Sequence, residues 1–195
     1  MEKEESLQAI RNYVHGLFCE EPTGHDFFHM KRVARTAKEI AAQEKADLFI
    51  TVASAWLHDI GDEKLFADPV KAVKDMIIFL ESIGLTNGQI MEIKKNIKNV
   101  SFRKGGVPET REGKIVQDSD RIDALGAVGI ARTFAYGGAK KQLIYHEDFH
   151  NTSIQHFYNK LLTLKDLLHT TTAKEIAQER HVFMETFLEQ FYNEW

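Results

Sequence analysis

The sequence predicts an all-α fold, a single compact helical domain over residues 1–195. Apolar residues recur every three to four positions through most of the chain, and almost no run alternates with the period of two that a strand requires. The prolines at positions 22, 69 and 108 all fall between these periodic segments, where helices can end. At 195 residues the chain is long enough to bury one substantial core.

The N-terminal half contains five expected helices, over about residues 4–19, 25–40, 47–59, 70–83 and 87–99. In the first, Leu7, Ile10 and Val14 are spaced to form one buried stripe. The third is almost entirely apolar, and Gly61 stops it.

The C-terminal half contains three longer segments with helical periodicity, over about residues 110–134, 152–169 and 173–193. The last two are strongly amphipathic, with Ile154, Phe157 and Leu161 on the apolar face of one and Phe183 and Phe187 on that of the other. We interpret these faces as core. Loops are expected over residues 101–108, 136–139 and 145–151.

The net charge argues against some classes of binding partner. A formal net charge of −4 offers no general attraction for duplex nucleic acid or an anionic membrane, although a local basic cluster could bind a small phosphorylated ligand. No apolar stretch approaches membrane-spanning length, and the first residues lack the features of a signal peptide. The single cysteine, Cys19, excludes an intramolecular disulfide. These features favour a cytoplasmic protein, and the oligomeric state, including a homodimer, stays open.

The adjacent residues His58 and Asp59 are the first to suggest chemistry. They follow the apolar run over residues 53–57, so their polar side chains need partners in a buried setting. A metal ion is one such partner. For an isolated pair, a histidine hydrogen-bonded to its neighbour and a carboxylate capping the helix would be the better explanation.

Further ligand types occur at compatible positions. His25 and His29 are four residues apart, so they share one face of a helix, and Asp118, Asp120 and Asp123 cluster in another apolar helix. Imidazole and carboxylate without thiolate suit a divalent ion such as Mn²⁺, Fe²⁺, Co²⁺, Ni²⁺ or Zn²⁺. Two histidines and two carboxylates would leave coordination positions open for water and a substrate oxygen.

These residues resemble the signature of the HD-domain phosphohydrolases, which is a histidine, an adjacent His-Asp pair and a distal aspartate. The resemblance assigns the histidine to His29, the pair to His58 and Asp59, and the distal aspartate to Asp120. In related enzymes the distal ligand commonly precedes a basic residue, as Asp120 precedes Arg121, and Asp118 is the alternative.

The resemblance runs from the second helix to the C-terminus. It implies a metal-binding core over about residues 25–135, a C-terminal helical pair over about residues 151–195, and one divalent ion, with Mn²⁺ preferred among the five ions above. Binuclear relatives carry extra histidines after the His-Asp pair, whereas this chain has no histidine between His58 and His146. We therefore expect a mononuclear site.

A general acid or base should lie beside the metal-bound water. Asp62 stands where related mononuclear enzymes place an acidic residue, and Glu63 is the adjacent alternative. An ordinary solvated carboxylate at a helix end explains either residue equally well.

A substrate rich in phosphate also needs cations. We expect these from Arg32, Arg121, Arg103 and Lys104, with Lys160 as a further member. His25 is expected to line the pocket, to orient a ligand or to be a fifth ligand. Structural ion pairs or a solvated loop are the alternatives for the cations.

The function implied by the resemblance is hydrolysis of a nucleotide. Some compact bacterial HD hydrolases are nucleoside triphosphate pyrophosphohydrolases, which is the expectation here. Hydrolysis of a nucleoside monophosphate by a 5′-nucleotidase is the nearest alternative. A non-catalytic metal-containing regulatory module and a purely structural helical protein are alternatives of other classes.

Overall fold

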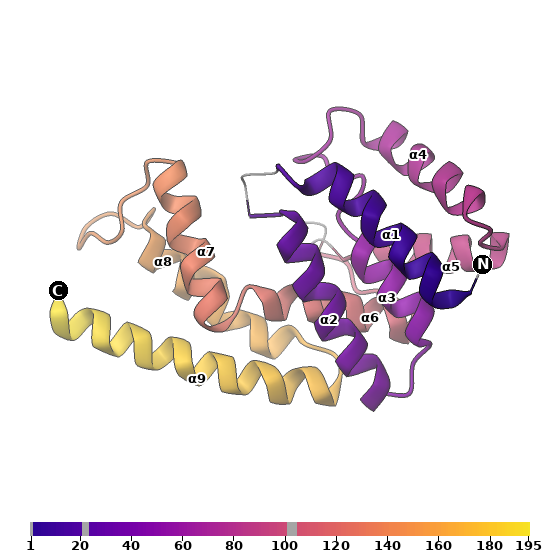
Figure 1. The fold of residues 1–195 in the computed structure, drawn as a ribbon. Helices are drawn as coiled ribbons and strands as arrows, with labels where there is room; N and C mark the ends of the chain where they lie inside the picture. The colour runs from indigo at the N-terminus through magenta and orange to yellow at the C-terminus, as the bar shows by residue number, and fades with distance from the viewer. Residues whose placement is uncertain (1, 21–23, 101–104) are drawn as a thin grey trace. The chain divides into compact units, whose positions relative to one another are not determined.

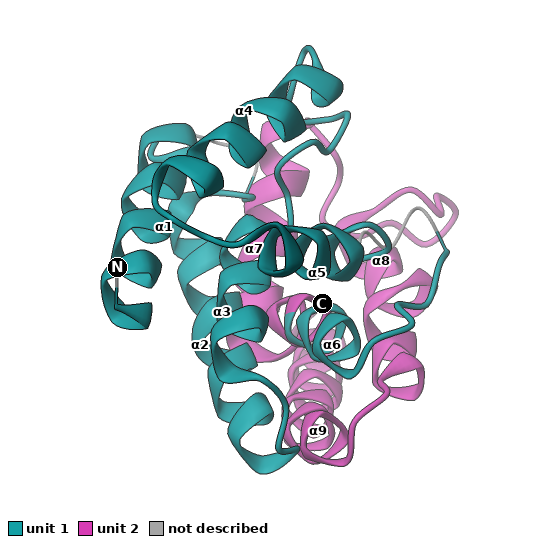
Figure 2. Ribbon diagram, turned by 90° about the vertical axis from the view of Figure 1, so that its right-hand side faces the viewer, with its two compact units in different colours: residues 1–119 teal, residues 120–195 magenta. Residues whose placement is uncertain are grey.

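A computed structural model describes residues 2–20, 24–100 and 105–195, and their fold is shown in Figure 1. These residues form helices joined by turns and loops and contain no β-strand, which confirms the all-α prediction. Arg103 and Lys104 lie outside the described residues. The chain divides into two compact units, residues 1–119 and 120–195, which are coloured separately in Figure 2. That the whole chain is one domain stays a prediction.

Unit 1 is built around a short helix that is buried from its second residue onward. Its helices are α1 (Lys3–Phe18), α2 (Phe27–Gln43), α3 (Leu48–Leu57), α4 (Pro69–Ser82), α5 (Asn87–Ile97) and the first part of α6 (Arg111–Asp123). Within this unit α3 packs against α1, α2 and α5. Residues 49–57 are all buried, which explains why α3 is apolar on every face instead of along one stripe.

Aspartate caps set where the two central helices of unit 1 begin. The Asp26 carboxylate accepts a hydrogen bond of 2.7 Å from the backbone N–H of His29, and Asp47 accepts one of 2.9 Å from Ile50. Such caps satisfy N–H groups that have no partner within the helix. The first cap therefore fixes His29 in the first turn of α2.

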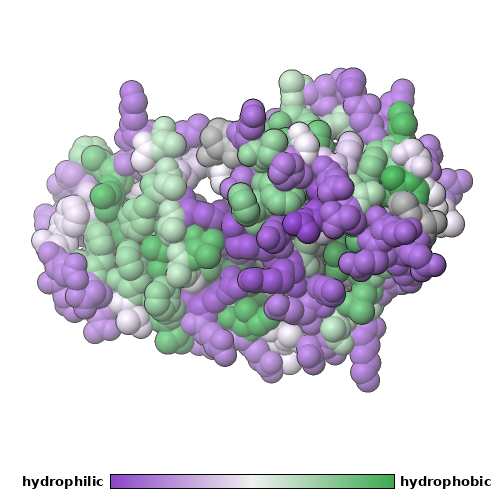
Figure 3. Space-filling model, viewed as in Figure 1, coloured by the Kyte–Doolittle hydropathy of each residue, from purple (hydrophilic) through white to green (hydrophobic). Residues whose placement is uncertain are grey.

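Unit 2 contains the end of α6, then α7 (Gly126–Ala139), α8 (Ser153–Asn159), the 3₁₀ helix η2 (Leu161–Leu167) and α9 (Thr171–Glu194). Within it, α7 packs against α8 and α9, and η2 packs against the same two helices. Phe157 is fully buried and stacks on Phe187 with a centroid separation of 5.8 Å. The apolar face predicted for residues 152–169 is therefore core, with Ile154 and Leu161 also buried. The face predicted for the last helix is wrong, because Phe183 is exposed and α9 instead buries Ala173, Ala177, His181, Met184 and Leu188. Hydrophobic residues also reach the surface of this unit (Figure 3), and Val128 and Tyr136 of α7 are exposed.

Two segments of the C-terminal half that we predicted as single helices each form two helices. The segment over 110–134 forms α6 and α7, which are separated at Ala124 and Leu125. Gly126 begins α7 with φ of +74°, a left-handed conformation that glycine adopts at little cost and that interrupts a helix. The segment over 152–169 forms α8 and η2, which are separated at Lys160 with φ of −140° and ψ of −60°.

The predicted loop over residues 136–139 is also wrong, because α7 continues to Ala139. Among the described residues, every helix is too short or too polar to cross a membrane.

Candidate metal centre

Three histidines of unit 1 gather around the carboxylate of Asp59. His25 Nδ1 lies 2.8 Å from Asp59 Oδ2, and His29 Nε2 lies 3.7 Å from the same oxygen. His58 Nε2 lies 3.4 Å from the other oxygen, Oδ1. The cluster thus combines a residue just before α2, a residue of its first turn and two residues at the end of α3. Its ligand atoms come from different elements, and local sequence alone does not fix their separation.

The cluster is largely withdrawn from water, and His25 is its exposed edge. His29, His58 and Asp59 are buried, whereas 37% of the His25 side chain is exposed. A buried carboxylate among imidazoles requires compensating positive charge. The site therefore has a dry interior and one side that solvent reaches.

Gly61 permits the sharp turn that follows Asp59. Its φ is +88°, and a Cβ at this position would lie 2.6 Å from Cγ2 of Val73. Any side chain here would be strained and would collide with α4. The His-Asp pair is consequently held between a rigid buried helix and a turn that only glycine fits.

His58 has a defined tautomer. Its Nδ1 lies 2.8 Å from the backbone carbonyl oxygen of Ala55. Because a carbonyl oxygen can only accept, Nδ1 carries the proton, and in the neutral ring Nε2 is a lone-pair donor. That nitrogen faces the Asp59 carboxylate, so a cation belongs between the two groups. Sequence reasoning did not identify the Ala55 carbonyl as the partner that orients His58.

The Asp59 carboxyl stays ionised despite its burial. Burial alone would raise its pKa, but His58, the hydrogen bond with His25 and the charge of His29 outweigh this effect and hold the pKa well below its usual range. An ionised carboxylate is the form that binds a metal ion.

The donor set fits a divalent metal ion. One ligand atom from each of His25, His29 and Asp59 lies within 4.8 Å of the other two. The 3.4 and 3.7 Å separations exceed an ordinary N–H···O hydrogen bond. The first matches, and the second slightly exceeds, the separation of about 3 to 3.5 Å between ligand atoms that share one ion. Nitrogen and oxygen donors without thiolate suit Mn²⁺, Fe²⁺, Co²⁺, Ni²⁺ or Zn²⁺.

The two aspartates weighed as the distal ligand fall in different units. Asp118 is fully buried and ends unit 1 together with Ser119, and Asp120 is half-buried and begins unit 2. The choice of Asp120 over Asp118 stays a prediction.

The predicted acid or base residues follow the cluster directly. The backbone N–H of Asp62 donates to the Asp59 carbonyl oxygen at 3.1 Å, and Asp62 Oδ1 accepts from the backbone N–H of Lys64 at 2.9 Å. Asp62 is half-buried, whereas Glu63 is exposed. One oxygen of Asp62 thus caps the turn, which is what we expect if Asp62 is an ordinary carboxylate at a helix end.

The predicted cations occupy several elements. Arg32 is half-buried in α2, three residues after His29. In unit 2, Arg121 Nη1 donates to the Leu167 carbonyl oxygen and lies 3.4 Å from His169 Nε2. Lys160 is half-buried between α8 and η2.

Comparison with known proteins identifies the family. Residues 26–125 match the HD domain. The chain is 42% identical to Bacillus subtilis YpgQ, which is described as uncharacterized, over 97% of this chain and 94% of that protein.

Solved structures agree over nearly the whole length. The crystal structure of Bacillus subtilis YpgQ in complex with ADP has a TM-score of 0.88 at 36% identity and covers 100% of this chain and 97% of that one. An HD-superfamily hydrolase from Bacillus thuringiensis has a TM-score of 0.85 at 39% identity, with coverages of 100% and 98%. The Lin1889 protein of Listeria innocua has a TM-score of 0.85 at 41% identity, with coverages of 98% and 96%. The chain belongs to the HD domain family and is a metal-dependent hydrolase.

Proposed function

We propose that the protein hydrolyses nucleoside triphosphates to nucleoside monophosphates and pyrophosphate. The observation that carries the nucleotide assignment is the ADP complex of YpgQ, a relative that covers the whole chain. ADP carries a nucleoside and a diphosphate, so a relative of this similarity that binds it supports the same ligand class here. The choice of pyrophosphate as product rests on the resemblance to pyrophosphohydrolases.

In the proposed site one Mn²⁺ ion is held by His29, His58, Asp59 and Asp120. When bound, a divalent ion supplies a water of lowered pKa and polarises a phosphoryl oxygen. His25 orients the Asp59 carboxylate through their 2.8 Å contact. Because His25 is also the exposed edge of the cluster, it is well situated to contact substrate.

Asp62 is the proposed base. Its backbone N–H donates to the Asp59 carbonyl oxygen, and its Oδ1 accepts from the backbone N–H of Lys64, so the carboxylate has a fixed orientation in the turn that follows the His-Asp pair. A fixed carboxylate can accept a proton from the attacking water or position that water. Glu63 is the weaker choice because it is exposed and lies one residue farther along the turn.

Cationic side chains are proposed to neutralise charge on the phosphate oxygens during attack. The proposed set is Arg32, Arg121, Lys160, Arg103 and Lys104. The guanidinium of Arg121 is supported by Leu167 and His169, which favours a defined position over a mobile one.

A screen of ribo- and deoxyribonucleoside mono-, di- and triphosphates tests the proposal. Metal-free protein is supplied with Mn²⁺, Fe²⁺, Co²⁺, Ni²⁺ or Zn²⁺ in turn, and pyrophosphate and orthophosphate are measured separately. Pyrophosphate release from triphosphates is expected, with Mn²⁺ most effective. Orthophosphate and nucleoside from monophosphates would support a 5′-nucleotidase instead.

A further inference from the structure

We infer that Arg180 and Arg132 are positioning residues that hold the C-terminal turn of α6, and with it Asp120, in place for the metal. The inference rests on the proposed function, because it takes Asp120 as a ligand. Arg132 lies in α7 and Arg180 in α9, and all the contacts that carry the inference lie within unit 2.

Arg180 binds the backbone at the end of α6. Its Nη1 donates a hydrogen bond of 2.7 Å to the carbonyl oxygen of Ile122. The last carbonyl groups of a helix have no N–H partner within the helix and carry partial negative charge. A guanidinium at this end supplies both a donor and a positive charge.

Arg132 binds the next residue through its side chain. Its Nη1 lies 2.7 Å from Asp123 Oδ2 and 3.4 Å from the Asp123 carbonyl oxygen. Only 4% of the Asp123 side chain and 25% of the Arg132 side chain are exposed. Such a charge-assisted contact, largely removed from water, fixes the orientation of the two groups.

Gly126 brings the stem of Arg180 against the turn that follows α6. A Cβ at Gly126 would lie 3.1 Å from Cγ and 3.3 Å from Cβ of Arg180. The aliphatic part of Arg180 therefore packs on the backbone of this turn while its head reaches Ile122. The glycine that begins α7 thus makes room for the side chain that binds the end of α6.

Asp120 belongs to the turn that these arginines hold. It precedes Ile122 by two residues and Asp123 by three, so one helical turn includes all three. A displacement of the last carbonyl groups would move the Asp120 backbone with them. Metal ligands need such support, and loss of an outer partner typically weakens metal binding by about 10-fold to 100-fold.

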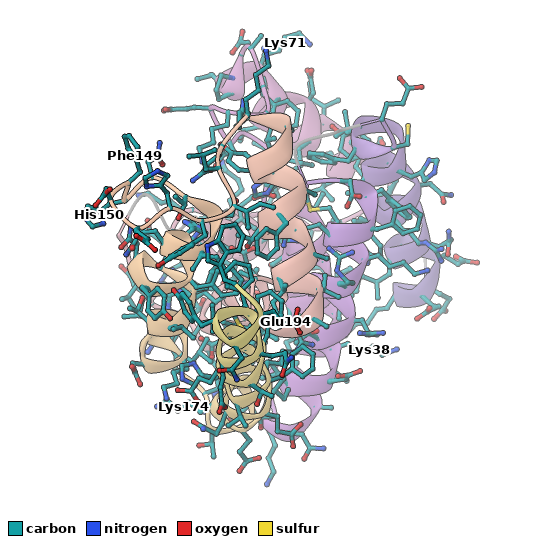
Figure 4. The ribbon with its side chains drawn as sticks, turned by 90° about the vertical axis from the view of Figure 1, so that its left-hand side faces the viewer. Lys38, Lys71, Phe149, His150, Lys174 and Glu194 are labelled. Carbon is teal, nitrogen blue, oxygen red and sulfur yellow. The ribbon has the colours of Figure 1, made fainter. Side chains whose placement is uncertain are left out.

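The test compares Arg180→Gln with Arg180→Lys, using Lys174→Gln as the matched control. Lys174 is exposed and extends outward from the same helix (Figure 4), so its replacement removes one cation from the surface of α9. Mn²⁺ affinity of metal-free protein is measured by calorimetry, and thermal unfolding is followed in EDTA. Arg180→Gln should weaken Mn²⁺ binding about tenfold, Arg180→Lys should restore most of the affinity, and Lys174→Gln should leave it unchanged.

A double-mutant cycle with Asp120→Asn separates positioning from a general structural role. If Arg180 acts through Asp120, Arg180→Gln causes no further loss of Mn²⁺ affinity in the Asp120→Asn background. An equal further loss in that background overturns the inference. Unchanged Mn²⁺ affinity in Arg180→Gln also overturns the inference, whether or not the melting temperature is lower. Unchanged Mn²⁺ affinity in Asp120→Asn alone overturns it as well. Absence of nucleotide turnover by the wild-type protein counts against the proposed function and leaves these affinity results intact.

Discussion

His58 Nδ1 donates a hydrogen bond to the backbone carbonyl oxygen of Ala55, 2.8 Å away in the last turn of α3. Nine consecutive residues of that helix are buried, so the carbonyl has little freedom to move. The imidazole consequently has a fixed ring orientation and tautomer, with Nε2 directed at Asp59. The atom that we propose as the metal ligand is thus oriented by the helix itself and not by a distant loop.

Replacement of His58 by asparagine separates metal binding from folding. The amide nitrogen of asparagine can occupy the position of Nδ1 and retain the bond to Ala55, but nothing replaces Nε2. His58→Asn should therefore remain folded and lose most of its Mn²⁺, from an expected stoichiometry of about one ion per chain. Elemental analysis together with far-ultraviolet circular dichroism measures both properties, and full Mn²⁺ occupancy in the variant would contradict the ligand assignment.

The distal ligand is tested by comparing two conservative substitutions. Asp120→Asn should weaken Mn²⁺ binding, because the resemblance assigns the ligand before Arg121. Asp118→Asn should instead lower the free energy of unfolding by about 1 to 3 kcal/mol, because it changes a fully buried polar group. Mn²⁺ titration and urea denaturation of both variants decide the matter. The reverse pattern would move the ligand to Asp118.

Asp62→Asn should retain the metal and lower turnover by about 100-fold to 10,000-fold, the usual contribution of a general base. Asparagine keeps an oxygen that can accept from Lys64, so the cap of the turn survives while the proton acceptor is lost. Glu63→Gln, which changes the exposed neighbour, is the control. Near-normal turnover of Asp62→Asn at saturating Mn²⁺ would remove Asp62 from the mechanism.

The stability of metal-free protein should fall as the pH is lowered through the ordinary pKa of histidine, and His156 should account for part of the loss. Burial, and secondarily the charge of Lys160, lowers the pKa of His156 below 6.5. The unfolded chain then binds the proton more readily, so stability is lost from about pH 6.5 downward until the folded pKa is passed.

His156→Gln should therefore show a flatter dependence of melting temperature on pH between about 7 and 5 than the wild-type protein. The matched control is His150→Gln, which removes an exposed histidine from the loop between α7 and α8. If His156→Gln and wild type have parallel profiles in EDTA, the burial of His156 does not control acid stability.

The sequence predicted the elements of unit 1 closely because local signals mark their ends. Asp26 and Asp47 are caps, and Gly61 stops the chain after the His-Asp pair. Apolar periodicity does not reveal a break inside an apolar segment. The interruptions at Gly126 and Lys160 were therefore missed, since the residues on either side continue the same pattern.

Part of the candidate site was also predictable. The spacing of His25 and His29 and the adjacency of His58 and Asp59 identified the residues that the structure brings together. The orientation of His58 by a backbone carbonyl could not be predicted, because every helical residue has such a carbonyl. Arg180, which binds the end of α6, comes from α9, 58 residues after its partner Ile122, and no local pattern specifies that pairing.

Turnover of a nucleoside triphosphate in ¹⁸O-enriched water, followed by ³¹P nuclear magnetic resonance, tests the proposed reaction most directly. Metal-free protein reconstituted with Mn²⁺ should yield monophosphate and pyrophosphate in equal amounts, with ¹⁸O in the monophosphate if water attacks the α-phosphorus. EDTA or Asp59→Ala should abolish both products. Release of orthophosphate in place of pyrophosphate, or undiminished turnover after removal of the metal, would contradict a metal-dependent pyrophosphohydrolase.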